Sequence, residues 1–433
     1  MQLKDRIASA SANVGVVGLG YVGLTEAVAL ARAGYHVTGF EVDCERIDAV
    51  QSGRSYIMDV PDEELLWAVR SWSLTATADF QALRDMDVIL ICVPTPLGKT
   101  KAPDISHILA AVEAIQARLR PGQLIVLEST TYPGTTVEVV LPALERTGLR
   151  AGEDFHLCFS PERINPGDKE HTVLTVPRIV GGVTPGCTEV ATALFARIAS
   201  EVVAVSSPQA AEIVKLLENT FRAVNIGLAN EIALMCRALG ADVWEVIDAA
   251  ATKPFGFMPF YPGPGLGGHC IPVDPLYLSW KARIKGFEPR FIELAHHINS
   301  AMPGFVVSLL TEALNDRGRS INGSRILVLG VTYKRDVNDI RESPALAIIA
   351  DLIRRGATVV YHDPYVPTLT VGDRTLASVL LDDLVLGGAD CALILTDHGV
   401  VDYKCVVDIA PIVVDTRNAT AAVVDPHRKV VRL

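Results

Sequence analysis

The sequence predicts an α/β protein in which two Rossmann-like α/β domains are joined by a central helical domain with one long helix. Short β-rich runs alternate with helical patterns over the first 200 residues and again after Gly323. Such alternation is typical of a mainly parallel sheet with helices on both faces. Between these two parts, apolar residues recur at helical spacing with few glycines or prolines. We expect three domains, at residues 1–206, 207–318 and 319–433.

The same patterns predict the individual elements. Strands are expected in the first part at residues 14–18, 36–41, 88–93, 124–128, 156–160, 178–182 and 201–205. The run 208–240 predicts one helix of about 30 residues, or ~45 Å. Further helices are expected at 243–250, 276–284 and 289–316, with a Gly/Pro-rich loop at 254–275. After Gly323, strands are expected at 324–331, 357–364, 391–397 and 413–418, with a helix at 345–356.

The composition is that of an ordinary globular protein and restricts the function. Hydrophobic residues make up 49% of the 433 residues and charged ones 21%, which excludes disorder and fibrous classes for the whole chain. Lys and Arg number 39 against 50 Asp and Glu, so the formal charge is −11. This balance argues against a general nucleic-acid binder and against docking on anionic membranes. An anionic substrate held by a few local basic residues remains compatible with it.

The cysteines indicate a reducing compartment, and we expect a cytoplasmic protein. The eight cysteines are scattered without a CxxC pair, so neither a metal site nor a dithiol site is expected. Cys92 and Cys391 lie in apolar strand-like runs and are expected to be buried and inert. The apolar segment 14–31 could imitate a membrane span, but its four glycines and Glu26 argue against one, and no membrane segment is expected.

A glycine-rich motif follows the first expected strand and opens a helical pattern. In Gly18-Leu19-Gly20-Tyr21-Val22-Gly23, the glycines allow a tight turn and a close approach of the backbone to a pyrophosphate at the helix N-terminus. The next strand ends in Glu41, whose carboxylate can accept hydrogen bonds from both ribose hydroxyls and would repel a 2′-phosphate. This context predicts NAD rather than NADP as cofactor. The alternative is a structural turn beside an ordinary acid.

Cys270 lies in the second candidate site, the segment Gly-Leu-Gly-Gly-His-Cys-Ile-Pro-Val-Asp-Pro. Small neighbours leave room for a substrate to approach a thiol, which indicates a nucleophile. His269 and Asp274 are near enough in sequence to position groups or move protons. The alternative is a structural cysteine in a tight loop, with His269 facing away.

The long helix carries the third candidate. Lys215, Asn219 and Arg222 follow one another at i, i+4 and i+7 and therefore share one face among apolar neighbours. This arrangement indicates the lining of a cavity, and a solvated stripe is the alternative. Other polar segments fall at expected strand ends or helix starts, where α/β sheets bind ligands. These segments are residues 129–136, 160–163, 289–292, 333–336, 339–344 and 415–418.

Together these residues resemble the UDP-glucose/GDP-mannose dehydrogenase family over nearly the whole chain, from GLGYVGL to DTRN. The loop sequence KPFGFMPFYPGPGLGGHC is most similar to the UDP-N-acetylglucosamine 6-dehydrogenase branch. The UDP-glucose branch typically has GGSC followed by Lys-Asp, whereas His269 and Pro272-Val273-Asp274 stand here. The family's partner-subunit arginine would fall near Pro254, and Lys253, Arg222 or Arg290 could replace it.

The resemblance implies a role for each matching residue. Cys270 matches the nucleophile, Lys215 and Asn219 the oxyanion donors, Glu162 the glutamate of the Pro-Glu motif, Thr130 the threonine that holds the catalytic water, and Asp274 the aspartate linked to proton transfer. The cofactor contacts implied are Gly18, Gly20, Tyr21, Val22, Gly23, Glu41, Arg46, Thr95 and Thr130. The substrate contacts implied are Glu162, Arg163, Lys215, Asn219, Arg222, Tyr261, Gly267, Lys334 and Arg417.

The activity implied is an NAD-dependent four-electron oxidation of the 6-hydroxymethyl group of a UDP-N-acetylhexosamine, with UDP-N-acetylglucosamine as the first expectation. The uronic acid would form through a Cys270 thiohemiacetal and thioester in a pathway of polysaccharide biosynthesis. UDP-glucose 6-dehydrogenase and UDP-N-acetylmannosamine dehydrogenase are alternatives. A hydroxyacid or 6-phosphogluconate-type dehydrogenase and a non-catalytic sensor of nucleotide sugars and NAD are further ones. The long apolar helix predicts a homodimer or higher homo-oligomer.

Overall fold

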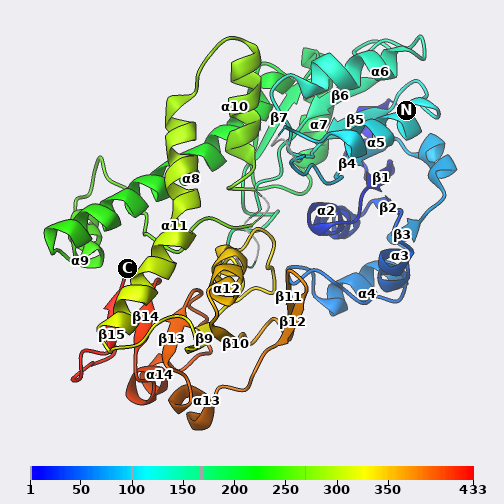
Figure 1. The fold of residues 1–433 in the computed structure, drawn as a ribbon. Coiled ribbons are helices and arrows are strands. Elements are labelled where there is room, and N and C mark those ends of the chain that lie inside the picture. Colours follow the sequence, from blue (N-terminus) through cyan, green and yellow to red (C-terminus); the bar gives the residue numbers. More distant parts are fainter. Residues whose placement is uncertain (1, 99–101, 165–166, 168–169, 269) are drawn as a thin grey trace. The chain divides into compact units, whose positions relative to one another are not determined.

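The computed structural model describes residues 2–98, 102–164, 167, 170–268 and 270–433 (Figure 1). Two compact units are formed, residues 1–218 with 276–287, and residues 219–275 with 288–433. The three-domain division expected from the sequence stays a prediction. Within the described residues, no helix is long and apolar enough to cross a membrane.

The first unit contains an eight-stranded sheet in the order β3-β2-β1-β4-β5-β6-β7-β8, parallel except between β6 and β7. Counted from β3 to β6, this is the strand order of dinucleotide-binding folds. The strands are β1 Asn13–Val17, β2 His36–Phe40, β3 Leu74–Thr77, β4 Val88–Ile91, β5 Leu124–Leu127, β6 His156–Phe159, β7 Arg178–Gly182 and β8 Val202–Ala204. The helical segments are α1 Leu3–Ala8, α2 Tyr21–Arg32, α3 Cys44–Gln51, α4 Asp62–Arg70, η1 Phe80–Asp85, α5 Ser106–Gln116, η2 Thr136–Val140, α6 Leu141–Glu145 and α7 Pro185–Phe195.

Alternate residues of these strands bury two separate apolar clusters. Val14 and Val16 of β1 pack with residues of α2, α4 and α7, whereas Val17 packs on the other face with residues of η1, α5 and α6. Because both faces of a doubly covered parallel strand are buried, runs such as Val88–Ile91 are apolar throughout. The carboxyl ends of β1 and β4 are thereby fixed next to the start of α2.

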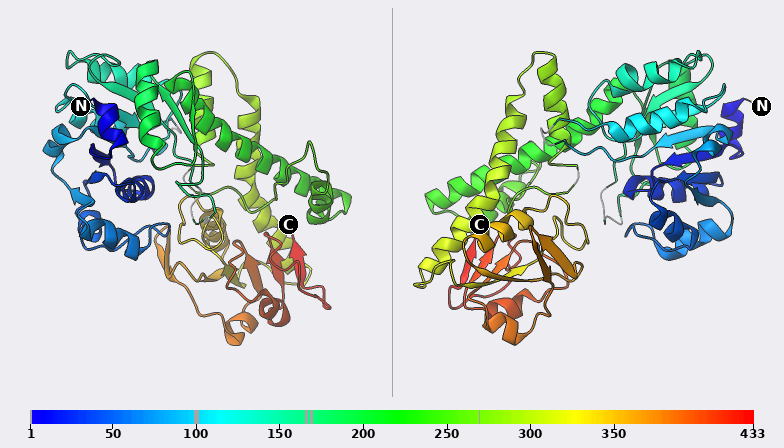
Figure 2. Two further views of the ribbon diagram at one scale, coloured as in Figure 1. Left: turned by 180° about the vertical axis from the view of Figure 1, so that it is seen from behind. Right: turned by 45° about the vertical axis from the view of Figure 1, so that its right-hand side comes forward.

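Four helices follow: α8 Pro208–Leu239, α9 Val243–Ala251, α10 Asp274–Ile284 and α11 Arg290–Asn315. In the second unit α11 crosses α8, as Figures 1 and 2 show. The helices cross closely at Gly227, where an added Cβ would lie only 3.2 Å from the Cα of Ala295. The Asn230 side chain donates to Asn299 Oδ1 at 2.8 Å, and the Asn299 amide donates to the Ala223 carbonyl at 3.0 Å. Buried polar groups therefore fix the register of the two helices.

The second unit also holds a parallel five-stranded sheet in the order β10-β9-β13-β14-β15. These strands are β9 Arg325–Leu329, β10 Thr358–His362, β13 Cys391–Ile394, β14 Val413–Asp415 and β15 Val430–Arg432, and β11 Thr368–Val371 and β12 Arg374–Ala377 form a hairpin. Residues of α11 and α12 (Pro344–Arg354) cover one face, and residues of α13 (Asp383–Gly387) and α14 (Tyr403–Ile409) cover the other (Figure 2). The strand order reverses between β9 and β13, which is where such sheets bind ligands.

The predicted fold class is confirmed, and the differences in its elements are local. Most expected strands end one to three residues earlier, as at β2, which ends before Glu41, and β14, which ends at Asp415. Strand β3, the β11–β12 hairpin and β15 were not expected, since each strand contains only three or four residues. Cys92 and Cys391 are buried as expected, and burial raises the pKa of both thiols.

Candidate active site

The three glycines of the first motif have three different structural roles. Gly18 has φ 89°, and a Cβ there would lie 2.8 Å from the Cys92 carbonyl oxygen. A Cβ on Gly23 would lie 1.8 Å from the Gly18 carbonyl oxygen, so α2 can pack on the turn only with glycine there. A Cβ on Gly20 would meet no protein atom within 4 Å. The turn therefore leaves open space at the N-terminus of α2, where Tyr21 and Val22 follow, and this space fits a pyrophosphate.

Glu41 is fixed at the end of β2 beside this turn. One carboxylate oxygen accepts a hydrogen bond from the Leu19 backbone N–H at 2.9 Å, and the other accepts from Val42 at 2.8 Å. The Arg46 guanidinium lies 3.5 Å from the first oxygen. The glycine turn and the acid are thus held as one rigid unit, which is the arrangement that suits the ribose and pyrophosphate of a dinucleotide.

Lys215 of α8 and Glu162 are brought together in the same unit. Both are buried, and the Lys215 ammonium donates to the Glu162 carbonyl oxygen at 2.6 Å. The Glu162 carboxylate accepts from the Ile164 backbone N–H. The Glu162 carbonyl therefore holds the Lys215 ammonium, and the Ile164 N–H holds the Glu162 carboxylate.

A buried charged cluster supports the Glu162 segment. Arg178 forms an ion pair with Glu26 of α2, lies 3.7 Å from Glu128 and donates to the Pro161 carbonyl at 3.4 Å. The Cys92 thiol donates to Glu128 at 3.3 Å. Burial raises the pKa of the Glu128 carboxyl, and the Glu162 charge raises it further. Two acids therefore share one guanidinium out of contact with water, and a neutral Glu128 balances the charge.

In the second unit, Cys270 precedes α10 by one turn. The Cys270 carbonyl accepts from the Val273 N–H at 3.0 Å and from the Asp274 N–H at 2.8 Å. Asp274 is buried, and the Asn219 amide of α8 donates to its carboxylate at 2.5 Å. The α8 segment and the cysteine turn are thus joined through Asn219 and Asp274. Cys270 itself is half-exposed.

Tyr333 closes one side of the cysteine loop. A Cβ on Gly267 would lie 2.5 Å from the Tyr333 Cβ, and one on Gly268 would lie 2.8 Å from its ring. The Gly268 N–H donates to the Arg341 carbonyl at 2.9 Å. Burial raises the pKa of the Tyr333 hydroxyl to about 12, and the charges of Asp339 and Cys270 add to this effect. The glycines before Cys270 are therefore required by the close approach of the Tyr333 side chain.

The strand ends of the second sheet carry the basic residues. Lys334 follows β9, and Arg417 follows β14. The Arg417 side chain donates to the Leu395 carbonyl at 3.0 Å, and a Cβ on Gly263 would lie 2.7 Å from one of its nitrogens. Burial lowers the pKa of the Arg417 guanidinium. This edge offers two cations at a reversal of strand order, where an anionic nucleotide can bind.

Other expected site residues have protein partners of their own. Arg163 forms a two-pronged ion pair with Glu218, at 3.2 and 2.6 Å. Tyr261 donates to Asp248 at 2.8 Å and stacks on Trp244. The Thr95 carbonyl accepts from the Tyr277 hydroxyl.

The remaining expected residues differ in exposure. Thr95 is buried, Thr130 is half-buried, and Arg222 is exposed although Lys215 and Asn219 on its helix face are buried. His269 lies outside the described residues. Among the residues that the structure describes, no three His, Cys, Asp or Glu side chains are grouped to hold a metal ion.

Sequence reasoning missed two groups of buried polar residues. The cluster of Glu26, Glu128 and Arg178 supports the Glu162 segment, and a group around His398 supports the Lys334 segment. An acid such as Glu26 inside an otherwise apolar helix was the available signal for the first. His398 follows a strand end in Thr396-Asp397-His398, which was the signal for the second.

The fold and these sites define an NAD-dependent dehydrogenase with a second nucleotide-binding sheet. Three sequence models of one family match the chain: the NAD binding domain at residues 12–199, the central domain at 209–301 and the UDP binding domain at 327–422. The chain belongs to the UDP-glucose/GDP-mannose dehydrogenase family. It is an NAD-dependent nucleotide-sugar dehydrogenase.

Individual relatives bear different substrate names. A UDP-N-acetyl-D-glucosamine 6-dehydrogenase of Pseudomonas aeruginosa is 39% identical over 82% of this chain and 83% of its own length. A UDP-N-acetyl-D-mannosamine dehydrogenase of Pyrococcus horikoshii is 37% identical over 89% of each chain. Among solved structures, a UDP-D-ManNAc dehydrogenase from Pyrococcus horikoshii has a TM-score of 0.88 and 35% identity, and the match covers 97% of this chain and 98% of the other.

Proposed function

We propose that the chain oxidises the 6-hydroxymethyl group of a UDP-N-acetylhexosamine to a carboxylate, with UDP-N-acetylglucosamine as the preferred substrate. The observation that carries this proposal is the Cys270 turn, in which the half-exposed thiol precedes Asp274 and its partner Asn219. A simple alcohol oxidation needs no cysteine at such a turn. Oxidation to the acid needs a group that holds the aldehyde, and a thiolate does so.

The proposed reaction removes two hydrides and adds one water. NAD accepts a hydride when bound at the glycine turn. The first oxidation converts the alcohol to an aldehyde, and the Cys270 sulfur adds to the aldehyde carbon to give a thiohemiacetal. The second oxidation converts this adduct to a thioester. Water then attacks the thioester carbon, the C–S bond breaks, and the carboxylate and the Cys270 thiol are released.

Each charged residue has a proposed task in this sequence. Lys215 and the Asn219 amide donate to the oxygen that becomes negative in the tetrahedral adducts, and one such donor is commonly worth about 3 kcal/mol. Asp274 orients the Asn219 amide and exchanges protons at the cysteine turn. Glu162 and Thr130 direct the attacking water. Lys334 and Arg417 bind the anionic nucleotide.

Two sequence features and the relatives support the N-acetylated sugar. His269 and Pro272-Val273-Asp274 stand where the UDP-glucose branch typically has Ser and Lys-Asp. Relatives named for UDP-N-acetyl-D-glucosamine and UDP-N-acetyl-D-mannosamine are 39% and 37% identical to the chain. The assignment to the class of UDP-N-acetylhexosamines is therefore better supported than the choice of one sugar within it. UDP-N-acetylmannosamine is the second candidate.

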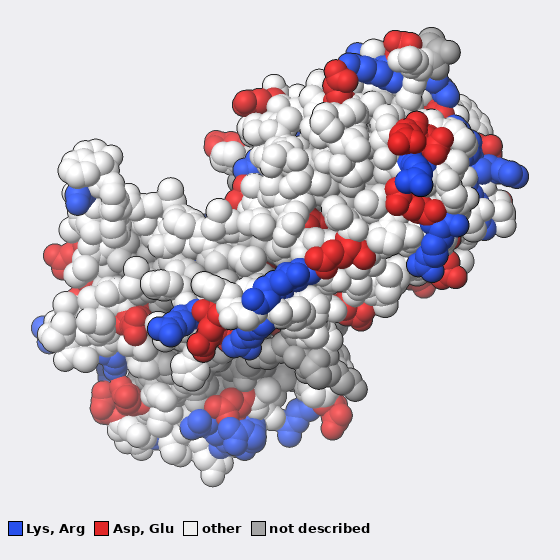
Figure 3. Space-filling view, turned by 90° about the horizontal axis from the view of Figure 1, so that it is seen from above, with Lys and Arg blue, Asp and Glu red and all other residues white. Residues whose placement is uncertain are grey.

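We also propose that the chain forms a homodimer through its central helices. Large apolar side chains are exposed on α8, α9, α11 and the loop after α9: Leu228, Met235, Leu239, Val246, Phe255, Phe257, Met258, Phe291 and Leu294. Phe255 is 71% exposed and Phe291 78%. In Figure 3 uncharged side chains make up most of the surface at the left of the view, where α9 lies. So many apolar residues are typical of an obligate interface.

Product stoichiometry with limiting sugars tests the proposed function. UDP-N-acetylglucosamine, UDP-N-acetylmannosamine, UDP-N-acetylgalactosamine and UDP-glucose are each incubated with excess NAD, and NADH and uronate are measured at completion. We expect two NADH per sugar, fastest with UDP-N-acetylglucosamine. Faster reaction with UDP-glucose would overturn the substrate assignment. Light scattering at micromolar concentration tests the dimer, and a monomer there would contradict it.

A further inference from the structure

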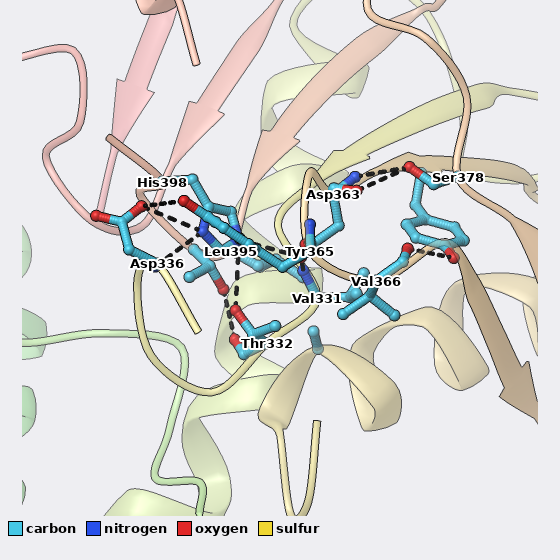
Figure 4. A network of polar contacts seen from close by, with 12 residues as sticks. Val331, Thr332, Asp336, Asp363, Tyr365, Val366, Ser378, Leu395 and His398 are labelled. Carbon is cyan, nitrogen blue, oxygen red and sulfur yellow. Dashed lines mark hydrogen bonds and ion pairs between the residues drawn. The ribbon is translucent and has the colours of Figure 1, made fainter. Parts of the chain in front are cut away.

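His398 is the centre of a buried polar cluster at the carboxyl edge of the second sheet (Figure 4). It follows β13 and is 0% exposed. Its Nε2 lies 3.1 Å from an Asp363 carboxylate oxygen and 3.3 Å from the Thr332 hydroxyl, and its Nδ1 lies 3.0 Å from the Asp336 backbone nitrogen. The Tyr365 ring packs on the imidazole, with centroids 5.1 Å apart.

These contacts define one tautomer of His398. The Asp336 backbone N–H can only donate, so Nδ1 must accept and carry no proton. The proton is therefore on Nε2, which donates to Asp363. Thr332 is compatible with this assignment, because its hydroxyl donates its single proton to the Lys334 carbonyl at 2.8 Å and can accept from Nε2.

Asp363 is built to remain charged and thereby to keep Nε2 protonated. It is 3% exposed and accepts hydrogen bonds from the backbone N–H groups of Val331 at 2.7 Å and Tyr365 at 2.9 Å. Although burial raises the pKa of the Asp363 carboxyl, its hydrogen bonds to His398 and to the two N–H groups lower it below the ordinary value overall. The carboxylate thus fixes the imidazole, as acids do in catalytic triads.

The cluster joins three strand-end loops across the reversal of strand order. Thr332 and Asp336 follow β9, Asp363 follows β10, and His398 follows β13. Asp336 has φ 58°, and its carboxylate accepts from the Gly399 N–H at 2.8 Å. The segment 332–336 is therefore held at both ends, and Lys334 lies between them.

We propose that His398 is a positioning residue for nucleotide-sugar binding, which holds the segment 332–336 through the Asp336 N–H so that Lys334 is presented to the ligand. This inference rests on the proposed function of Lys334. His398 touches no reacting atom. Its loss is expected to weaken UDP-sugar binding and to leave NAD binding unchanged, because the glycine turn belongs to the other unit.

Two substitutions separate positioning from packing. In His398→Asn the side-chain oxygen can accept from the Asp336 N–H, but a cavity forms. In His398→Leu the space is filled, but that N–H loses its acceptor. We expect the KM for UDP-N-acetylglucosamine to rise about tenfold in His398→Leu, as one lost hydrogen bond predicts, and less than threefold in His398→Asn. The KM for NAD stays at the wild-type value in both variants.

A larger rise in the KM for UDP-N-acetylglucosamine in His398→Asn than in His398→Leu would overturn the inference, since it means that His398 only fills space. An equal rise in the KM for NAD and in the KM for UDP-N-acetylglucosamine would also overturn it. If His398→Leu does not fold, His398→Gln replaces it, because the longer amide reaches Asp363 but gives the Asp336 N–H no acceptor at the Nδ1 position.

A double-mutant cycle with Lys334→Ala tests the route of the effect. If His398 acts through Lys334, adding His398→Leu to Lys334→Ala raises the KM for UDP-N-acetylglucosamine less than twofold further. A full additional tenfold rise would show that His398 acts elsewhere. If Lys334→Ala leaves the KM for UDP-N-acetylglucosamine unchanged, the proposed function of Lys334 is wrong. If this KM rises in Lys334→Ala but not in His398→Leu, only the positioning role of His398 is overturned.

Discussion

Replacing Gly20 with alanine is expected to weaken NAD binding without destabilising the protein. Gly20 has φ −70° and ψ −162°, a conformation that alanine adopts readily. A Cβ there meets no protein atom within 4 Å, so the free energy of unfolding should change by less than about 0.5 kcal/mol. The added methyl group occupies the space that the pyrophosphate needs. We expect the Kd for NAD to rise about ten- to a hundredfold, or ~1.4–2.8 kcal/mol.

Gly23→Ala is the matched control for this prediction. Its Cβ would lie 1.8 Å from the Gly18 carbonyl oxygen, so the helix and the turn must move apart by more than 1 Å. Overpacking of this kind costs about 1–3 kcal/mol, and a melting temperature lower by roughly 2–10 °C follows for a domain of this size. Gly23→Ala should therefore lose both stability and NAD binding.

Calorimetric titration with NAD and thermal unfolding of the two variants provide the assay. Gly20→Ala should have the melting temperature of the wild type and bind NAD weakly. Gly23→Ala should have a lower melting temperature and also bind NAD weakly. Wild-type affinity for NAD in Gly20→Ala would refute the assignment of the glycine turn as the pyrophosphate site. A lower melting temperature in Gly20→Ala would show that the space beside Gly20 is not free.

Three further outcomes are expected. Cys270→Ser should lower uronate formation, measured by product chromatography, at least a thousandfold. The control is Cys405→Ser, which replaces a half-exposed cysteine of α14 and should keep wild-type turnover. Equal turnover in the two variants would exclude covalent catalysis. Asn219→Ala should lower kcat by roughly a hundredfold with little change in the KM for NAD, since one oxyanion donor is removed, and an unchanged kcat would refute that role. Glu128→Gln should flatten the pH dependence of stability. Burial raises the pKa of Glu128, so from about pH 4.5 upward the folded state binds a proton that the unfolded state has lost. The free energy of unfolding of the wild type therefore falls by up to about 1.4 kcal/mol per pH unit. Urea unfolding from pH 5 to 8 measures this slope, and an unchanged slope in Glu128→Gln would contradict a neutral Glu128.

Features that depend on neighbouring residues were predictable from the sequence. The glycine turn and Glu41 follow from a strand, a turn and a helix in succession, and the structure keeps them together. The Cys270–Asp274 turn is local in the same way. The contact of Asn219 with Asp274 joins residues 55 apart, and helical spacing alone could not reveal it. Only the resemblance to a family linked the two residues in advance.

Other features depend on topology and could not be read from single motifs. Arg163 pairs with Glu218 from another element, and a charge pattern does not show which acid lies opposite, whereas its predicted contact with the substrate stays a prediction. His398 and Asp363 each follow an ordinary strand end. They meet because β9 lies between β10 and β13 in the sheet, an order that no local pattern contains.

The ratio of NADH formed to UDP-N-acetylglucosamine consumed distinguishes thioester chemistry from a simple alcohol oxidation. With limiting sugar and excess NAD, we expect two NADH and one uronate per sugar, with no free aldehyde. A ratio of one with an aldehyde product would contradict this expectation, because the Cys270 thioester would then have no place in the reaction.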